Sequence, residues 1–189
     1  SLLDRAETSL RQVGGQSKYG IPAKESLLEM YQIEKDWSQA IVASQELEVL
    51  QGKSHHTEIA HFHCQLAEEA LARKNIGVAL EHIDYAMQAV PNHPRATILK
   101  GDWFVAQNQL EQALSAWALI AKNHVAYLPI VADRWIDVHK VLGRANEGLQ
   151  TLIDALQTQA GGEWATGGDT FAQVHFLRTQ PHSLVDNLN

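Results

Sequence analysis

An internal repeat of about 34 residues constrains the fold of this chain more than any other feature. Four stretches align on one alanine each: LLDRAE (2–7), DWSQAI (36–41), NIGVAL (75–80) and NQLEQAL (108–114). The shared position holds Ala6, Ala40, Ala79 and Ala113. A fifth, weaker copy, RANEGL (144–149), places Gly148 there. Residues four and seven positions further on are mostly apolar, which is the spacing of one helix face.

A unit of two helices with small residues where they cross resembles the tetratricopeptide repeat (TPR). The segment GDWFVAQNQLEQALSAWALIAK (101–122) matches this pattern well, and residues 66–91 match it nearly as well. We therefore predict an all-α fold, a right-handed α-solenoid of TPR helix pairs, because such units bury a core only by stacking.

The resemblance to the repeat covers residues 1–157. We expect repeats near 1–20, 21–59, 60–93, 94–128 and 129–157, a Gly-rich connection at 158–168, and a terminal helix of an incomplete repeat at 169–189. The chain starts in the middle of a repeat, so we expect it to be a fragment of a longer protein whose exposed end faces favour self-association. The interval from Ala40 to Ala79 is five residues longer than the interval from Ala79 to Ala113. We assign these extra residues to the segment around GKSHHT (52–57) and expect a longer loop there.

The stretch HHTEIAHFHC (55–64) holds four histidines and the single cysteine, which are metal-ligand types. His61, Cys64 and Glu68 fall on one helix stripe. One helix supplies too few ligands for a tetrahedral ion, and there is no Cys-x-x-Cys pair, so we predict no metal and no cofactor here. We expect His63 to be a packing residue, and His55 and His56 to be exposed in the loop or to help cap the next helix.

Positions that line the concave groove in TPR proteins carry more acidic than basic residues. The candidate partner-binding residues are Glu25, Glu29, His61, Cys64, Glu68, Arg95, Asp102, Asp133 and Asp137. One hypothesis is an acidic groove that attracts a partner segment with Lys or Arg. The alternative is that these carboxylates are an ordinary solvated surface.

The sequence gives no support for catalysis or for nucleic-acid binding. The net charge is −7, whereas nucleic-acid binders present a basic face. Asp133 and Asp137 share a helix face, and His61 lies one turn from Cys64, but neither pair comes with a predicted pocket or oxyanion hole. One cysteine cannot form an internal disulfide, which fits a reducing compartment. No apolar run is long enough to span a bilayer.

The order of LLDRAE (2–7), LLEMYQIEKDWSQAI (27–41), TEIAHFHCQLAEEAL (57–71) and VPNHPRA (90–96) resembles the lipopolysaccharide assembly protein B family of Gram-negative bacteria. The segment EIAHFHCQLA (58–67) carries most of this resemblance. It implies a non-catalytic adaptor at the cytoplasmic side of the inner membrane. The implied partners are a membrane-bound ATP-dependent protease and the lipid A pathway deacetylase, whose degradation the adaptor promotes. The family's N-terminal membrane helix and rubredoxin-like metal module have no counterpart in these residues, so the chain resembles the central repeat region alone.

Two other readings stay open at this stage. TPR arrays are also attached to glycosyltransferase domains, and others act as generic co-chaperones. Chaperone-binding clamps use lysine and asparagine in the groove, which this acidic lining fits poorly.

Overall fold

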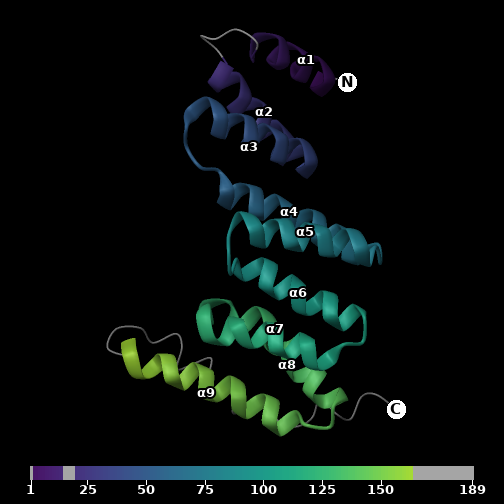
Figure 1. The fold of residues 1–189 in the computed structure, drawn as a ribbon, viewed down its shortest axis with the longest axis vertical. Helices are drawn as coiled ribbons and strands as arrows, with labels where there is room; N and C mark the ends of the chain where they lie inside the picture. Colours follow the sequence, from purple (N-terminus) through teal and green to yellow (C-terminus); the bar gives the residue numbers. More distant parts are fainter. Residues whose placement is uncertain (1, 15–19, 164–189) are drawn as a thin grey trace. The chain divides into compact units, whose positions relative to one another are not determined.

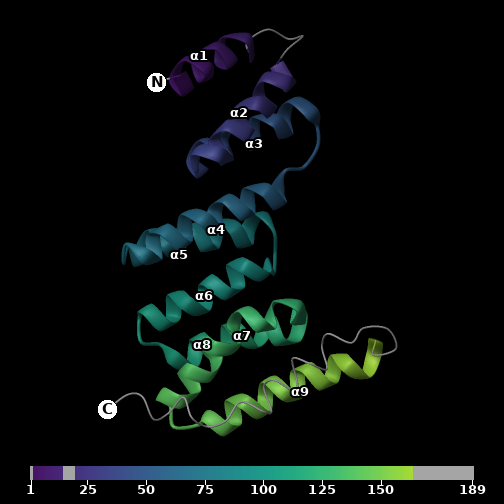
Figure 2. The same cartoon turned by 180° about the vertical axis from the view of Figure 1, so that it is seen from behind.

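The computed structural model describes residues 2–14 and 20–163, and this part of the chain is helical without a strand (Figure 1). Its elements are α1 (Leu2–Gly14), α2 (Gly20–Glu34), α3 (Trp37–Gln51), α4 (His56–Ala72), α5 (Ile76–Ala89), α6 (Pro94–Ala106), α7 (Leu110–Asn123), the 3-10 helix η1 (Val125–Tyr127), α8 (Leu128–Val141) and α9 (Ala145–Glu163). The prediction of an all-α fold is confirmed for these residues, while the right-handed solenoid of TPR pairs stays a prediction. The same helices are seen from behind in Figure 2.

One tight turn recurs four times, in phase with the sequence repeat. It joins α2 to α3, α4 to α5, α6 to α7 and α8 to α9. A residue with positive φ occupies the same place in each turn: Lys35 (58°), Lys74 (59°), Asn108 (59°) and Gly143 (71°). The next residue donates its N–H to the carbonyl five residues earlier, over 2.7 to 2.9 Å. This bond satisfies a carbonyl at the end of the first helix, so each turn fixes where the second helix begins.

The small residues of the repeat lie where the helices pack. Ala40, Ala79 and Ala113 are each fully buried. Gly148 is also buried, and a Cβ atom there would lie 2.5 Å from Cγ of His139. Ala6 is exposed on α1, because no helix in the described residues covers that face. A larger side chain at the buried positions would force the paired helices apart.

The extra residues between Ala40 and Ala79 lengthen helices and leave the loop short, so the prediction of a longer loop was wrong. The loop between α3 and α4 is residues 52–55, and the loop between α5 and α6 is residues 90–93. Helix α4 has 17 residues, whereas α6 has 13. Glu58 lies in the first turn of α4, where a negative charge stabilises the helix dipole, and this favours the additional turn.

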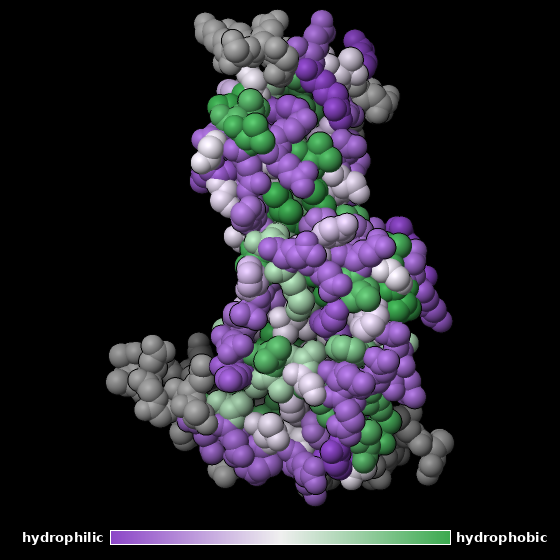
Figure 3. Space-filling model, in the orientation of Figure 1, coloured by the Kyte–Doolittle hydropathy of each residue, from purple (hydrophilic) through white to green (hydrophobic). Residues whose placement is uncertain are grey.

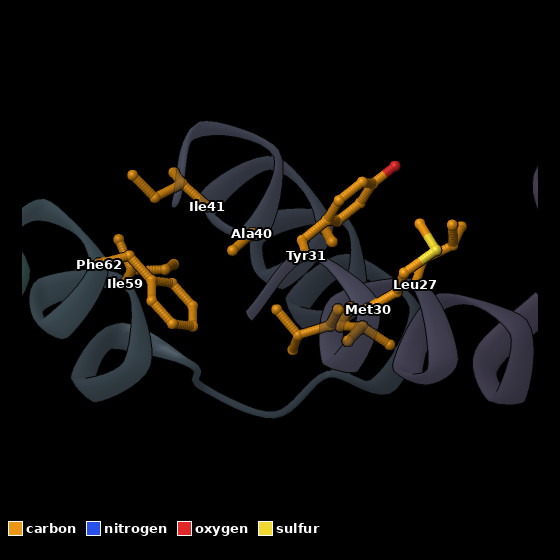
Figure 4. Close-up of a cluster of buried hydrophobic side chains, with 10 residues drawn as sticks. Leu27, Met30, Tyr31, Ala40, Ile41, Ile59 and Phe62 are labelled. Carbon is orange, nitrogen blue, oxygen red and sulfur yellow. The ribbon is translucent and has the colours of Figure 1, made fainter. Parts of the chain in front are cut away.

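The chain divides into two compact units, residues 1–116 and 117–189. In the first unit, one core cluster joins α2, α3 and the start of α4, with Leu27, Leu47 and Phe62 among its members (Figure 4). A second cluster joins α4, α5 and α6 through Cys64, Ile83 and Leu99. Helix α4 contributes to both clusters, so its two sides connect the neighbouring helix pairs.

The second unit has its own core, in which α8 packs against α9 and η1. Trp135 stacks on His139 with ring centroids 5.2 Å apart, and the His139 Nδ1–H donates to the Trp135 carbonyl oxygen over 2.9 Å. Helix α9 runs to Glu163, so residues 158–163 of the expected Gly-rich connection are helical. Glycine lowers helix propensity by about 1 kcal/mol but does not prevent continuation of an established helix. The rest of that connection, and the predicted helix at 169–189, lie outside the described residues.

The face of the molecule seen in Figure 3 is mainly hydrophilic, with hydrophobic patches between the hydrophilic residues. Within residues 2–14 and 20–163, no helix is both long and apolar enough to cross a membrane.

Candidate interaction surface

Three of the candidate residues meet in one polar cluster on α4 and α6. The Arg95 guanidinium donates from Nε to Glu68 Oε1 over 3.0 Å and from Nη2 to Glu68 Oε2 over 2.6 Å. Its Nη1 lies 3.3 Å from His61 Nδ1. Because an arginine only donates, His61 Nδ1 must accept and the ring is neutral in this arrangement. Burial, and then the charge of Arg95, lower the pKa of His61, which is consistent with a neutral ring.

An aromatic side chain from the preceding helix borders this cluster. Trp37, the first residue of α3, stacks on Phe62 with ring centroids 5.9 Å apart and meets His61 edge-on at 6.4 Å. The Trp37 indole N–H donates to Glu69 Oε1 over 3.1 Å. The surface of α4 near His61 is therefore bordered by an indole on one side and by Arg95 on the other.

Cys64 does not belong to this surface, and the prediction that it lines an accessible groove was wrong. Its side chain is fully buried, and Sγ lies 3.9 Å from Nδ1 of His93. Burial raises the pKa of the Cys64 thiol to about 12. Helical spacing places Cys64 near His61 and Glu68, but α6 packs over this part of α4 and covers the thiol.

The other candidate carboxylates of the first unit differ in their surroundings. Glu25 and Glu29 are exposed on α2, and Glu25 accepts from Gln51 Nε2 over 2.9 Å. Asp102 on α6 is partly buried. Together with Glu68, these residues give α2, α4 and α6 four carboxylates against the single guanidinium of Arg95.

Asp133 and Asp137 lie on α8 in the second unit, and both are exposed. Lys140 Nζ donates to Asp137 Oδ1 over 3.1 Å. A single groove that runs past all four helix pairs stays a prediction, because it would cross the boundary between the two units.

His63 faces away from this surface, toward α5. It is partly buried, as expected for a packing residue, and its Nδ1 lies 3.1 Å from Nδ1 of His82. The His63 ring stacks on the Tyr85 ring with centroids 5.2 Å apart. Burial, and then the neighbouring His82, lower the pKa of His63 to about 4, while burial lowers the pKa of His82.

Sequence reasoning missed His82, which lies 19 residues from His63. His63 lies ten residues before the turn at residues 73–75 and His82 seven residues after it, so equal spacing from the turn pairs His63 with Tyr85 and not with His82. Residues equidistant from the turn of an antiparallel helix pair lie side by side.

The two remaining histidines of the segment HHTEIAHFHC (55–64) lie at the start of α4. His56 is exposed, as predicted, with Nε2 3.4 Å from Glu48 Oε1. His55 is partly buried and precedes the helix without a capping bond from its side chain. Its backbone N–H donates to Glu48 Oε1 over 2.6 Å, so Glu48 of α3 holds the loop against the start of α4.

The described residues contain no group of three or more histidine, cysteine, aspartate or glutamate side chains arranged to hold a metal ion. His61, the expected partner of Cys64, contacts Arg95 instead, and His93 is the ring nearest the buried thiol. These contacts place His61 and Glu68 beside Arg95 in one polar surface cluster.

Comparison with known proteins supports the resemblance seen in the sequence. No family model matches the chain. The chain is similar to lipopolysaccharide assembly protein B. The identity is 25% to the protein of Escherichia coli (strain K12), over 94% of this chain and 48% of the relative, and the values are the same for the protein of Escherichia coli O157:H7. The chain thus spans about half the length of the curated relatives it matches. This similarity confirms the predicted resemblance.

Proposed function

We propose that this chain is a non-catalytic TPR scaffold that binds protein partners in the regulation of lipopolysaccharide synthesis. The observation that carries the proposal is the turn repeated in phase with the sequence, together with the buried small residue that follows it in each helix pair. This combination is expected of a stacked helical repeat, and such repeats serve as binding surfaces. The similarity to lipopolysaccharide assembly protein B supports the biological process.

The partner segment is proposed to be basic. The candidate groove positions of α2, α4 and α6 hold four carboxylates and one guanidinium, and Arg95 donates two hydrogen bonds to Glu68. The negative charge of Glu68 is thus partly compensated within the protein, so Glu25 and Glu29 on α2 contribute most to attraction of Lys or Arg from a partner. Trp37 adds an apolar surface next to His61 and Glu69 of α4.

By the resemblance, the proposed partners are the membrane-bound ATP-dependent protease and the lipid A pathway deacetylase. The proposed location of the full-length protein is the cytoplasmic side of the inner membrane. The chain itself is proposed to bind the partner and to leave proteolysis to the protease.

Affinity capture with paired charge variants tests this proposal. The chain is used as bait in a Gram-negative lysate, and captured proteins are identified by mass spectrometry at low and high salt. The variant Glu25→Lys/Glu29→Lys should lose the deacetylase or the protease at low salt, since both reversed charges are exposed. The variant Glu81→Lys/Asp154→Lys makes the same change in net charge at exposed positions of α5 and α9 and should retain capture.

The two parts of the proposal fail separately in this experiment. Capture of neither protein by the unmodified chain contradicts the proposed partners. Equal capture by both double variants contradicts the acidic surface on α2, but leaves the scaffold role in place.

A further inference from the structure

His63 and His82 form a pair of nitrogen ligands that the interaction surface does not use. The two Nδ1 atoms, one from α4 and one from α5, lie 3.1 Å apart. The rings are only partly buried, and the adjacent Tyr85 side chain is 50% exposed, so solvent and small ions reach this face of the helix pair. We propose that His63 and His82 together bind a divalent transition-metal ion of the Zn²⁺, Ni²⁺ and Cu²⁺ class.

The separation of the two nitrogens fits one ion. Imidazole nitrogens bind Zn²⁺ at about 2.0–2.1 Å. Two nitrogens 3.1 Å apart and each at this distance from an ion enclose an angle of about 98° at the ion, which follows from the observed separation. This angle lies between those of square-planar and tetrahedral coordination. The nitrogens need not move apart or together; only the ring planes must turn so that both lone pairs point at the ion.

The protonation state of the pair also favours an ion. A metal binds the unprotonated nitrogen, so each proton on a ligand competes with the ion. At 3.1 Å one Nδ1–H donates to the other Nδ1, and when an ion binds that proton moves to Nε2 of the same ring, so that both Nδ1 lone pairs are available to the ion.

The other histidines near this segment are engaged differently. His61 Nδ1 accepts from Arg95, and the Nδ1 of His93 accepts from the backbone N–H of Ala96. Within the part of the chain that the structure describes, two protein ligands meet at the proposed site, so water fills the other coordination positions and the affinity is modest. Because the ligands come from both helices, the ion connects α4 to α5.

Calorimetric titration of the full 189-residue chain with Zn²⁺, after removal of any purification tag and in a buffer that does not bind metal, tests the site. We expect one ion bound per chain above the weak background from the other histidines. His63→Gln and His82→Gln should each weaken this binding about tenfold or more, as loss of a metal-binding interaction does. His56→Gln removes an exposed histidine elsewhere and should leave the affinity unchanged.

Electron paramagnetic resonance of the chain loaded with one Cu²⁺ adds an independent readout. Coupling to two imidazole nitrogens is expected in the unmodified protein, and circular dichroism confirms that each variant is folded. Affinities for the His63→Gln and His82→Gln variants equal to that of the unmodified chain would overturn the proposal. So would a site that disappears only in His56→Gln, or the absence of stoichiometric binding.

Discussion

Acidification should destabilise the pair of helices α4 and α5 through His63. Burial holds the pKa of His63 near 4 in the folded chain, against about 6.5 for an unfolded histidine. The folded state therefore resists a proton that the unfolded state accepts. The stabilisation is fully present above about pH 6.5 and is lost as the pH falls toward 4. For these two pKa values, the loss between about pH 7.5 and 5 is about 2 kcal/mol.

The physical cause is local. In the neutral pair, one Nδ1 donates to the other across 3.1 Å, whereas a protonated His63 and a protonated His82 present two donors and two like charges to each other. Glutamine at position 63 keeps hydrogen-bonding capacity but does not titrate. The His63→Gln variant should therefore lose about 2 kcal/mol less stability over this pH interval than the unmodified chain.

Urea denaturation followed by circular dichroism at a series of pH values measures the difference. The slope of stability against pH is the relevant quantity, because the substitution also changes packing against Tyr85 at every pH. His56→Gln is the matched control, since it removes an exposed histidine at the start of the same helix. Parallel stability curves for His63→Gln and the unmodified chain would refute the assigned role of His63.

Three further predictions follow from packing. Ser44 is fully buried, and its Oγ is among the described side-chain atoms that have no hydrogen-bond partner, so Ser44→Ala should raise the free energy of unfolding by about 1 kcal/mol in urea denaturation; a decrease would mean that the hydroxyl is satisfied. Gly148→Ala should lower the free energy of unfolding by about 1–3 kcal/mol, because the new Cβ would lie 2.5 Å from the His139 ring. Gly77→Ala in α5 is the control, since its Cβ would meet nothing within 4 Å and the change should be neutral or stabilising. Equal effects of the two substitutions would contradict this packing. Cys64 is fully buried and its pKa is raised to about 12, so a thiol reagent at neutral pH should label it only at the rate of unfolding. Fast labelling of the native chain would show that α6 does not cover the thiol.

The repeat in the sequence predicted the helix crossings well, because paired helices approach closely only where the side chains between them are small. The alanine phase located Ala40, Ala79 and Ala113 at buried crossings, and four turns with the same hydrogen bonds lie five residues before the shared position. The spacing failed at the connection between α3 and α4. A count of residues between repeats does not say whether an insertion extends a loop or adds a helical turn, and α4 took the added residues.

The candidate surface was predicted only where neighbouring positions on one helix decide the outcome. His61 and Glu68 do lie on one face of α4, and both contact Arg95. The exposure of Cys64 was predicted wrongly, because the helix that covers it is 30 residues away in the chain. The negative charge of Glu68 is also partly compensated by Arg95, because the hydrogen bonds between these two residues form only when α6 packs beside α4.

The sequence by itself determined that the described part of this chain is helical and which small residues lie at the crossings of its paired helices. These properties follow from local conformational preference and from a repeated spacing of apolar residues that matches one face of a helix. Only the tertiary structure decided that Cys64 is buried and that His63 meets His82. Both results depend on which side chain of a distant helix occupies the adjoining space, and a pattern along one helix does not contain that information.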